Sequence, residues 1–210
     1  MRLLPVGEDS LLLDLDGPQE AQAWHAEIVR RRGEGPLAAV RDIVPGATTV
    51  LLYGVSDLPG LKTTLQRWSV PPLAAHSGPL VEIPVHYDGE DLAVVAELWG
   101  VGKDEVARVH SSVEHRVAFS GFAPGFAYMT GLDERYHVPR RSAPRTSVPA
   151  GSVAVASNCT GIYPRSSPGG WQLIGTTSVN VWDTNRRPAA LLAPGTRVRF
   201  VPADAERGAA

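Results

Sequence analysis

The first third of the chain contains apolar runs of two kinds, which together predict a small unit of strands and helices. Strand-like runs rich in apolar or β-branched residues occupy residues 10–15, 41–44 and 48–53. A helix is predicted over residues 18–32, where apolar residues recur every three or four positions after Pro18, a residue that suits the first helical turn. A second helix is predicted around residues 61–68. This combination is typical of an α+β domain whose sheet is covered on one face.

A segment rich in proline and small residues, 70–79, lacks periodicity and is the expected domain boundary. Beyond it, apolar and polar residues alternate over 81–87, which predicts a half-buried strand that Pro84 places at a sheet edge. Two short helices are predicted around residues 92–99 and 106–110. The second unit therefore begins with one strand and a helical pair.

After Val113 the chain consists of short β-rich runs separated by turns that contain Gly and Pro. The runs occupy residues 116–119, 152–156, 179–182 and 197–201. Such spacing is typical of a small closed or nearly closed β-barrel. We expect an α+β fold class with an N-terminal α+β domain at 1–79, a β-barrel domain at 80–203 and a flexible tail at 204–210.

Composition narrows the possible partners. The 20 basic and 22 acidic residues give a net charge of −2, which disfavours binding to nucleic acid or to an anionic membrane. The 21 Gly and 18 Pro favour turns and short strands. Cys159 is the sole cysteine, so an intrachain disulfide is excluded. With no apolar run of membrane-spanning length, a cytoplasmic protein is expected.

Residues 121–183 concentrate the features of chemical interest, while phosphate loops, dinucleotide fingerprints and serine-hydrolase elbows are missing from the sequence. Cys159 is expected to be a buried and inert thiol, because nothing in the sequence brings His110 or His115 to it. The histidines also lack the spacing of metal ligands, so no metal site is expected.

The first of three notable segments is an aromatic loop, 121–128, in which Pro124 presets one turn dihedral and Gly125 can adopt positive φ. Its aromatic rings either close one end of the barrel or line a small-molecule pocket through Phe126 and Tyr128. The residue types leave both interpretations open.

The second is an arginine segment, 139–145, in which Arg140, Arg141 and Arg145 lie on a stretch stiffened by two prolines. Guanidinium groups suit carboxylate or phosphate oxygens. A solvated basic loop and an anion site are both possible, and the prolines favour the site because they reduce the cost of ordering.

The third is a glycine segment, 160–172, in which Pro168-Gly169 has the residues of a type II turn. Gly169 and Gly170 would leave backbone N–H groups open to a ligand oxygen. The alternative is a tight hairpin that buries Trp171 in the core.

The order and spacing of these motifs resemble the KipI family, also known as allophanate hydrolase subunit 1, whose enzyme members are the B subunits of bacterial 5-oxoprolinase. The motifs that carry the resemblance are 42–46, 82–91, 121–128, 139–145, 148–153, 160–164 and 167–172. They extend it from near residue 1 to about residue 202.

The resemblance implies that the barrel is cyclophilin-like and that the chain works in a heteromeric complex. In the family, the B subunit associates with a larger C subunit, and together they use ATP, with Mg²⁺ implied, to activate 5-oxoproline. A separate A subunit completes hydrolysis to L-glutamate. The B subunit is expected to be inactive alone.

On this interpretation the three segments converge at one end of the barrel. Arg140, Arg141 and Arg145 are the expected catalytic residues, which offset phosphate or substrate-carboxylate charge. The expected substrate-binding residues are Phe126, Tyr128, Thr160, Tyr163, Ser167, Gly169, Gly170 and Gln172.

Three positions depart from the family pattern and put the substrate, more than the fold, in doubt. Cys159 replaces Gln, Thr176 replaces Arg, and Thr130 replaces Gly. Two other functions therefore stay open: a regulatory module that inhibits a sensor histidine kinase, and biotin-dependent carboxyl transfer or allophanate-type amide chemistry in urea metabolism. Prolyl isomerase activity is least favoured, because fold alone does not confer function.

Overall fold

A computed structural model of the chain describes residues 1–74 and 78–203. The chain divides into two compact units, Met1–Ser77 and Gly78–Ala210, and this division falls within the proline-rich segment 70–79. The predicted tail, 204–210, and residues 75–77 of the predicted boundary lie outside the described residues.

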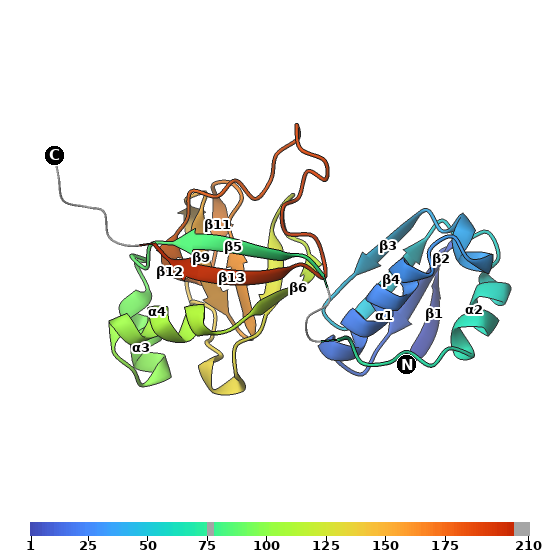
Figure 1. Ribbon diagram of the computed structural model, residues 1–210, viewed down its shortest axis with the longest axis horizontal. Coiled ribbons are helices and arrows are strands. Elements are labelled where there is room, and N and C mark those ends of the chain that lie inside the picture. Colours follow the sequence, from blue (N-terminus) through green and yellow to red (C-terminus); the bar gives the residue numbers. More distant parts are fainter. Residues whose placement is uncertain (75–77, 204–210) are drawn as a thin grey trace. The chain divides into compact units, whose positions relative to one another are not determined.

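The N-terminal unit is built on a four-stranded antiparallel sheet in the order β1-β2-β4-β3 (Figure 1). Its strands are β1 (Arg2–Val6), β2 (Ser10–Asp14), β3 (Asp42–Pro45) and β4 (Thr49–Tyr53). The three strands expected from apolar runs are present. β1 was not predicted, because four of its five residues are exposed and its sequence lacks a buried alternating face.

Two helices cover the core of this unit. Helix α1 (Pro18–Arg30) begins at the proline, as predicted, and ends two residues before the predicted end. A short 3-10 helix, η1 (Gly35–Ala39), follows, and α2 (Leu58–Gln66) is capped by Asp57, whose side chain accepts from the Gly60 N–H at 2.9 Å. Apolar faces of both α-helices and alternate residues of the strands form one buried cluster.

The C-terminal unit is a seven-stranded sheet in the order β12-β9-β10-β7-β6-β13-β5. Its strands are β5 (Leu80–Val85), β6 (His115–Ser120), β7 (Ala127–Thr130), β9 (Ser152–Ala156), β10 (Cys159–Ile162), β12 (Gln172–Thr176) and β13 (Arg197–Pro202). The terminal strands meet where the His86 N–H donates to Thr176 O at 2.9 Å and the Thr176 N–H donates to His86 O at 2.8 Å. The sheet is thus a nearly closed barrel, which confirms the predicted α+β fold class.

Helices α3 (Leu92–Trp99) and α4 (Lys103–Ser112) connect β5 to β6, as the periodicity predicts (Figure 1). A 3-10 helix, η2 (Glu134–Tyr136), follows β7. A separate pair of short strands, β8 (Arg145–Val148) and β11 (Ser167–Gly169), completes the unit. None of the helices in the described ranges has both the length and the apolarity needed to cross a membrane.

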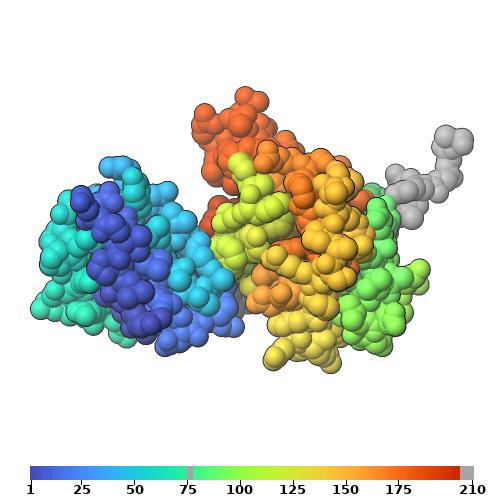
Figure 2. Space-filling model, turned by 180° about the vertical axis from the view of Figure 1, so that it is seen from behind, coloured from blue at the N-terminus to red at the C-terminus, as the bar shows by residue number. Residues whose placement is uncertain are grey.

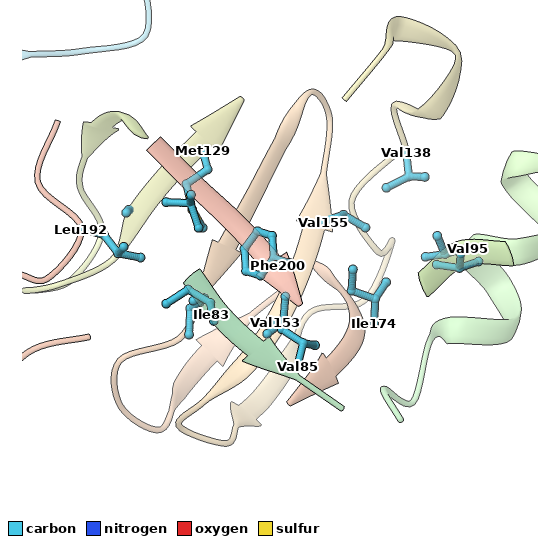
Figure 3. Close-up of a cluster of buried hydrophobic side chains, with 14 of the residues drawn as sticks. Ile83, Val85, Val95, Met129, Val138, Val153, Val155, Ile174, Leu192 and Phe200 are labelled. Atoms are coloured by element: carbon cyan, nitrogen blue, oxygen red, sulfur yellow. The ribbon is translucent and has the colours of Figure 1, made fainter. Parts of the chain in front are cut away.

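Branched and aromatic side chains fill the barrel interior (Figure 3). Met129, Val153, Val155, Ile174 and Phe200 reach this core from strands β7, β9, β12 and β13, and each is at most 1% exposed. Every residue of β9 is buried, because its alternate residues Ala154 and Ala156 belong to a second apolar cluster. The wall of the barrel is therefore covered on its outer face as well.

The predicted strand at 179–182 is wrong. This stretch contains only an isolated bridge between Trp182 and Ala190, at the base of a loop that projects from the unit (Figure 1). The Arg186 guanidinium donates to the carbonyl oxygens of Asn180 at 3.1 Å and Ala189 at 2.9 Å. Side-chain hydrogen bonds to the backbone thus hold the loop in place of a strand ladder.

Two buried histidines form a polar chain inside the barrel. The Tyr87 hydroxyl donates to His110 Nδ1 at 2.8 Å, and His110 Nε2 donates to Thr160 Oγ1 at 3.1 Å. His115 Nε2 donates to the His110 carbonyl at 3.1 Å, and His115 Nδ1 has no partner among the described residues. Burial lowers the pKa of His115 to about 4 and lowers that of His110 well below its ordinary value. Both imidazoles are therefore neutral in the folded protein.

Stability is expected to fall as the pH is lowered from 7 to 5. In this range the unfolded chain takes up protons on both imidazoles near pH 6.5, whereas the folded barrel does not, so acid favours unfolding. The free energy of unfolding, measured with urea, should be roughly 3 kcal/mol lower at pH 5 than at pH 7. His115→Phe should halve this difference, while His137→Gln, at an exposed position, should leave it unchanged. Equal pH dependence in the wild type, His115→Phe and His137→Gln would contradict the conclusion that His115 is buried and neutral.

Candidate functional site

The second apolar cluster lies on the outer face of the barrel wall and contains three buried aromatic rings. Phe126, Tyr163 and Trp171 pack there against Ala154 and other small residues of the wall. The Phe126 ring makes edge-to-face contacts with Tyr163 and Trp171, each with ring centroids 5.3 Å apart. Small residues on this face let the rings approach the sheet closely.

The aromatic loop is a tight turn, as predicted. The Phe126 N–H donates to Ala123 O at 2.9 Å, and Gly125 has φ +83°. A Cβ at Gly125 would lie 2.5 Å from Trp182 Cβ, so this position also requires glycine for close approach. The turn buries Phe126 but leaves Phe122 60% exposed, with φ 64°.

A pocket of about 80 Å³ opens between the three segments singled out in the sequence. Its lining residues are Phe122, Phe126, Tyr128, Arg140, Tyr163, Pro168, Gly169, Gly170 and Trp171. In Figure 2 the yellow-green surface of the aromatic loop and the orange surface of the glycine segment meet on one face of the C-terminal unit. The segments therefore converge, but on the outer face of the barrel wall rather than at one end of the barrel.

The glycine segment differs from the predicted turn. Pro168 and Gly169 lie in β11, and Gly169 does not have the positive φ that a type II turn requires. Glycine is needed at 169 for another reason: a Cβ there would lie 2.8 Å from Tyr163 Cζ. Trp171 is 5% exposed, so this segment buries its tryptophan and also lines the pocket.

The three arginines of the arginine segment have different surroundings. Arg140 lines the pocket, whereas Arg141 and Arg145 are bound by carboxylates. Arg145 donates to both oxygens of Asp91 at 2.9 Å and to Glu90 at 3.0 Å, and Arg141 donates to Asp91 at 2.7 Å. Arg141 and Arg145 are therefore held by carboxylates and do not line the pocket.

Asp91 was missed by sequence reasoning. It is 3% exposed and lies directly before α3, and its side chain also accepts from the Leu173 N–H at 2.8 Å. Burial raises its pKa, but hydrogen bonds from Arg145 and Leu173 outweigh burial, so the pKa of this carboxyl is lowered and it stays ionised. The signals in the sequence were its place in the motif 82–91 and its position before an apolar helical run.

Three expected substrate-binding residues do not line the pocket. Thr160 is inside the barrel with His110, and Ser167 Oγ donates to the Arg165 carbonyl at 3.4 Å. Gln172 Nε2 donates to the Pro139 carbonyl at 3.2 Å, so this side chain anchors the arginine segment.

Burial sets the protonation of the pocket walls. It raises the pKa of Tyr128 and of Tyr163, so both phenols are neutral near pH 7. It also raises the pKa of the neighbouring Cys159 thiol to about 11, which disfavours a reactive thiolate, although Cys159 is half-buried and not fully buried as predicted. Within residues 1–74 and 78–203, no group of three His, Cys, Asp or Glu side chains could hold a metal ion.

Asp91→Asn should lower the free energy of unfolding by about 3 kcal/mol, because it leaves two guanidinium groups without their buried partner. Glu90→Gln is the matched control, since the Glu90 side chain is 71% exposed and its ion pair with Arg145 is worth at most about 1 kcal/mol. Urea unfolding of the two variants compares them directly. Equal losses of stability in the two variants would show that the ion pairs of Asp91 do not hold the arginine segment.

Gly169→Ala should displace Tyr163 and lower stability by about 1–3 kcal/mol, because the added methyl group overlaps the phenol. Gly170→Ala should change stability by no more than about 0.5 kcal/mol, since its Cβ would lie 3.6 Å from Pro144, an ordinary contact. Near-ultraviolet circular dichroism reports the aromatic packing of each variant. An unchanged spectrum for Gly169→Ala would contradict the close approach.

Over residues 1–192 the sequence matches the family described as "Carboxyltransferase domain, subdomain C and D". The chain is 41% identical over 208 residues to the 5-oxoprolinase B subunit of Escherichia coli O157:H7, covering 94% of each chain. It is 36% identical over 208 residues to the protein of the same name from Haemophilus influenzae, covering 96% of this chain and 97% of that one.

Solved structures share the fold. TTHA0988 matches with a TM-score of 0.78 and 36% identity over 95% of this chain, which spans only 41% of that protein. PH0987 from Pyrococcus horikoshii matches with a TM-score of 0.58 and 31% identity, covering 98% of this chain and 99% of that one. The K. lactis urea amidolyase, at 17% identity and a TM-score of 0.68, shares the fold alone. The chain thus belongs to the carboxyltransferase C and D subdomain family, with the B subunits of 5-oxoprolinase, as its motifs predicted.

Proposed function

We propose that this chain is the B subunit of a cytoplasmic ATP-dependent 5-oxoprolinase, which converts 5-oxoproline to L-glutamate. The observation that carries the proposal is the nearly full-length alignment with two bacterial proteins that bear this name. The chemistry requires an energy source, because the lactam of 5-oxoproline is an unreactive amide. ATP, with Mg²⁺, supplies a phosphoryl group that turns the lactam oxygen into a leaving group.

The pocket is small for a nucleotide. Sites for drug-sized ligands occupy about 300–1,000 Å³, whereas this pocket has a volume of about 80 Å³. Its lining also contains one cation, Arg140, too few for a triphosphate. We therefore assign no step of phosphoryl transfer to the residues of this pocket. ATP is bound by the assembled enzyme at another place.

The proposed function also requires partner chains, because we assign the binding of ATP to the assembled enzyme and not to this pocket. The proposed partners are a larger C subunit of the same family and an A-type hydrolase subunit. The match to TTHA0988 leaves more than half of that protein outside the alignment, which supports a working unit larger than this chain. Alone, the chain is expected to release no glutamate.

Reconstitution with the C and A subunits encoded in the same genome tests the proposal. Glutamate release should require all three chains and ATP, and a non-hydrolysable ATP analogue should not support it. Omitting this chain should abolish the activity, and heat-unfolded chain should not restore it. ATP-dependent turnover without this chain would refute the proposal.

Carboxyl transfer is the second candidate, favoured by the description of the matched family. It requires biotin on a carrier and a urea-type substrate. Supplying urea and a biotinylated carrier in place of 5-oxoproline distinguishes the two reactions. Biotin-dependent carboxylation in the absence of 5-oxoproline turnover would favour this candidate.

A further inference from the structure

Arg140 is the cation of the arginine segment that the fold leaves unneutralised. Arg141 and Arg145 are bound by Asp91, but no ion pair engages Arg140 within the described ranges. Its side chain is exposed, at the rim of a pocket whose other walls are aromatic rings and backbone. A free guanidinium beside an aromatic pocket is an arrangement that attracts a single carboxylate.

The Arg140 charge acts inside the pocket. Burial raises the pKa of Tyr128 and of Tyr163, while the nearby Arg140 charge opposes this rise in both, and the Arg145 charge also opposes it in Tyr163. The Arg140 charge opposes the effect of burial on the pKa of Cys159 as well. Arg140 lines the pocket together with both phenols, so its charge is close to the space that a ligand would occupy.

The Tyr163 hydroxyl supplies a neutral polar group to the pocket wall. Its ring packs against Gly169, whose lack of a side chain leaves room for the phenol. A neutral phenol can donate its hydrogen to an oxygen of a ligand. The site therefore combines one cation with one neutral donor.

Phe122 forms the outer wall. Its ring stands edge-to-face to Phe126 and Tyr163, with ring centroids 5.3 Å and 6.3 Å apart. A non-glycine residue at φ 64° costs about 1 kcal/mol or more, and such strain persists where the surrounding structure requires that geometry. The strain keeps an apolar ring 60% exposed at the pocket mouth, where a ligand would cover it.

We propose that this pocket binds a small cyclic carboxylic acid, with its carboxylate on Arg140, its ring against Phe122 and Trp171, and an oxygen accepting from Tyr163. Naming that acid 5-oxoproline rests on the proposed function. The pocket volume of about 80 Å³ lies below the range of sites for drug-sized ligands, which favours a small acid over a nucleotide. The chain is thus the lactam-binding part of the enzyme.

Calorimetric titration with 5-oxoproline, on the chain alone and in complex with the C subunit without ATP, tests the proposal. Saturable binding is expected, and Arg140→Gln should weaken it about tenfold or more, the loss expected for a charge-assisted hydrogen bond. Arg165→Gln is the matched control: it removes an exposed arginine of the glycine segment that does not line the pocket, and affinity should be unchanged. Phe122→Ala should also weaken binding.

Two further probes define the ligand. Pyrrolidin-2-one, which lacks the carboxylate, should bind about tenfold or more weaker than 5-oxoproline and should be indifferent to Arg140→Gln. ATP should not compete. Competition by ATP, an unchanged affinity in Arg140→Gln, or no saturable binding at millimolar concentration in either preparation would overturn the site assignment.

The outcome is separable from that of the proposed function. If glutamate release requires this chain but 5-oxoproline does not bind here, the site assignment fails and the function stands. If 5-oxoproline binds in an Arg140-dependent manner but the reconstituted subunits release no glutamate, the site stands and the function fails.

Discussion

The buried carboxylate of Asp91 is the interaction on which the geometry of the pocket depends. It joins the start of α3 to β12 through the Leu173 N–H and to the arginine segment through Arg141 and Arg145. The Arg141 N–H in turn donates to the Gly170 carbonyl at 2.8 Å, so the glycine segment is fixed to the same junction. Burying one charge is costly, but here two cations and a backbone donor compensate for the lost water. The walls of the pocket therefore depend on a charge outside it.

A second constraint is that the barrel wall is packed on both faces. β9 places Val153 and Val155 in the interior, and Ala154 and Ala156 on the aromatic cluster outside. Because the interior is filled with side chains, a binding site has to be built on the outer surface. Gly161 makes this possible: a Cβ there would lie 2.9 Å from Phe126 Cζ and 3.0 Å from Trp171.

Much of the fold could be predicted because local patterns agreed with the tertiary structure. The Pro18 helix start and the alternation in β5 follow from residues that behave locally as they do in the fold. β1 was not predicted, because an exposed strand lacks an alternating buried pattern. Residues 179–182 were predicted to be a strand, but their backbone lies in a loop. Pairing with β2 makes a strand of β1 despite its weak local signal, whereas residues 179–182 have a strand-like sequence but lack a strand partner beyond one isolated bridge.

The site was predictable in its segments but not in its chemistry. Sequence reasoning found the three segments that meet, since Gly, Pro and aromatic residues mark rigid turns whatever their partners. It could not tell which of Arg140, Arg141 and Arg145 faces the pocket. Two of them are neutralised by Asp91, a carboxylate 50 and 54 residues away in the sequence. Spacing carries no information on such pairs.

The different surroundings of the three arginines bear on how the proposed ATP-dependent reaction would be divided between chains. A triphosphate carries several negative charges, and known sites neutralise them with lysine, arginine, metal ions and backbone N–H groups together. Had all three arginines faced the pocket, a phosphate site there would have been reasonable. With two of them paired with Asp91, one guanidinium remains on the pocket, which is the charge that a ligand with a single carboxylate needs. On the proposed function, recognition of the small acid would then be separate from recognition of the nucleotide, and this separation would be a physical reason for such a chain to act as a subunit.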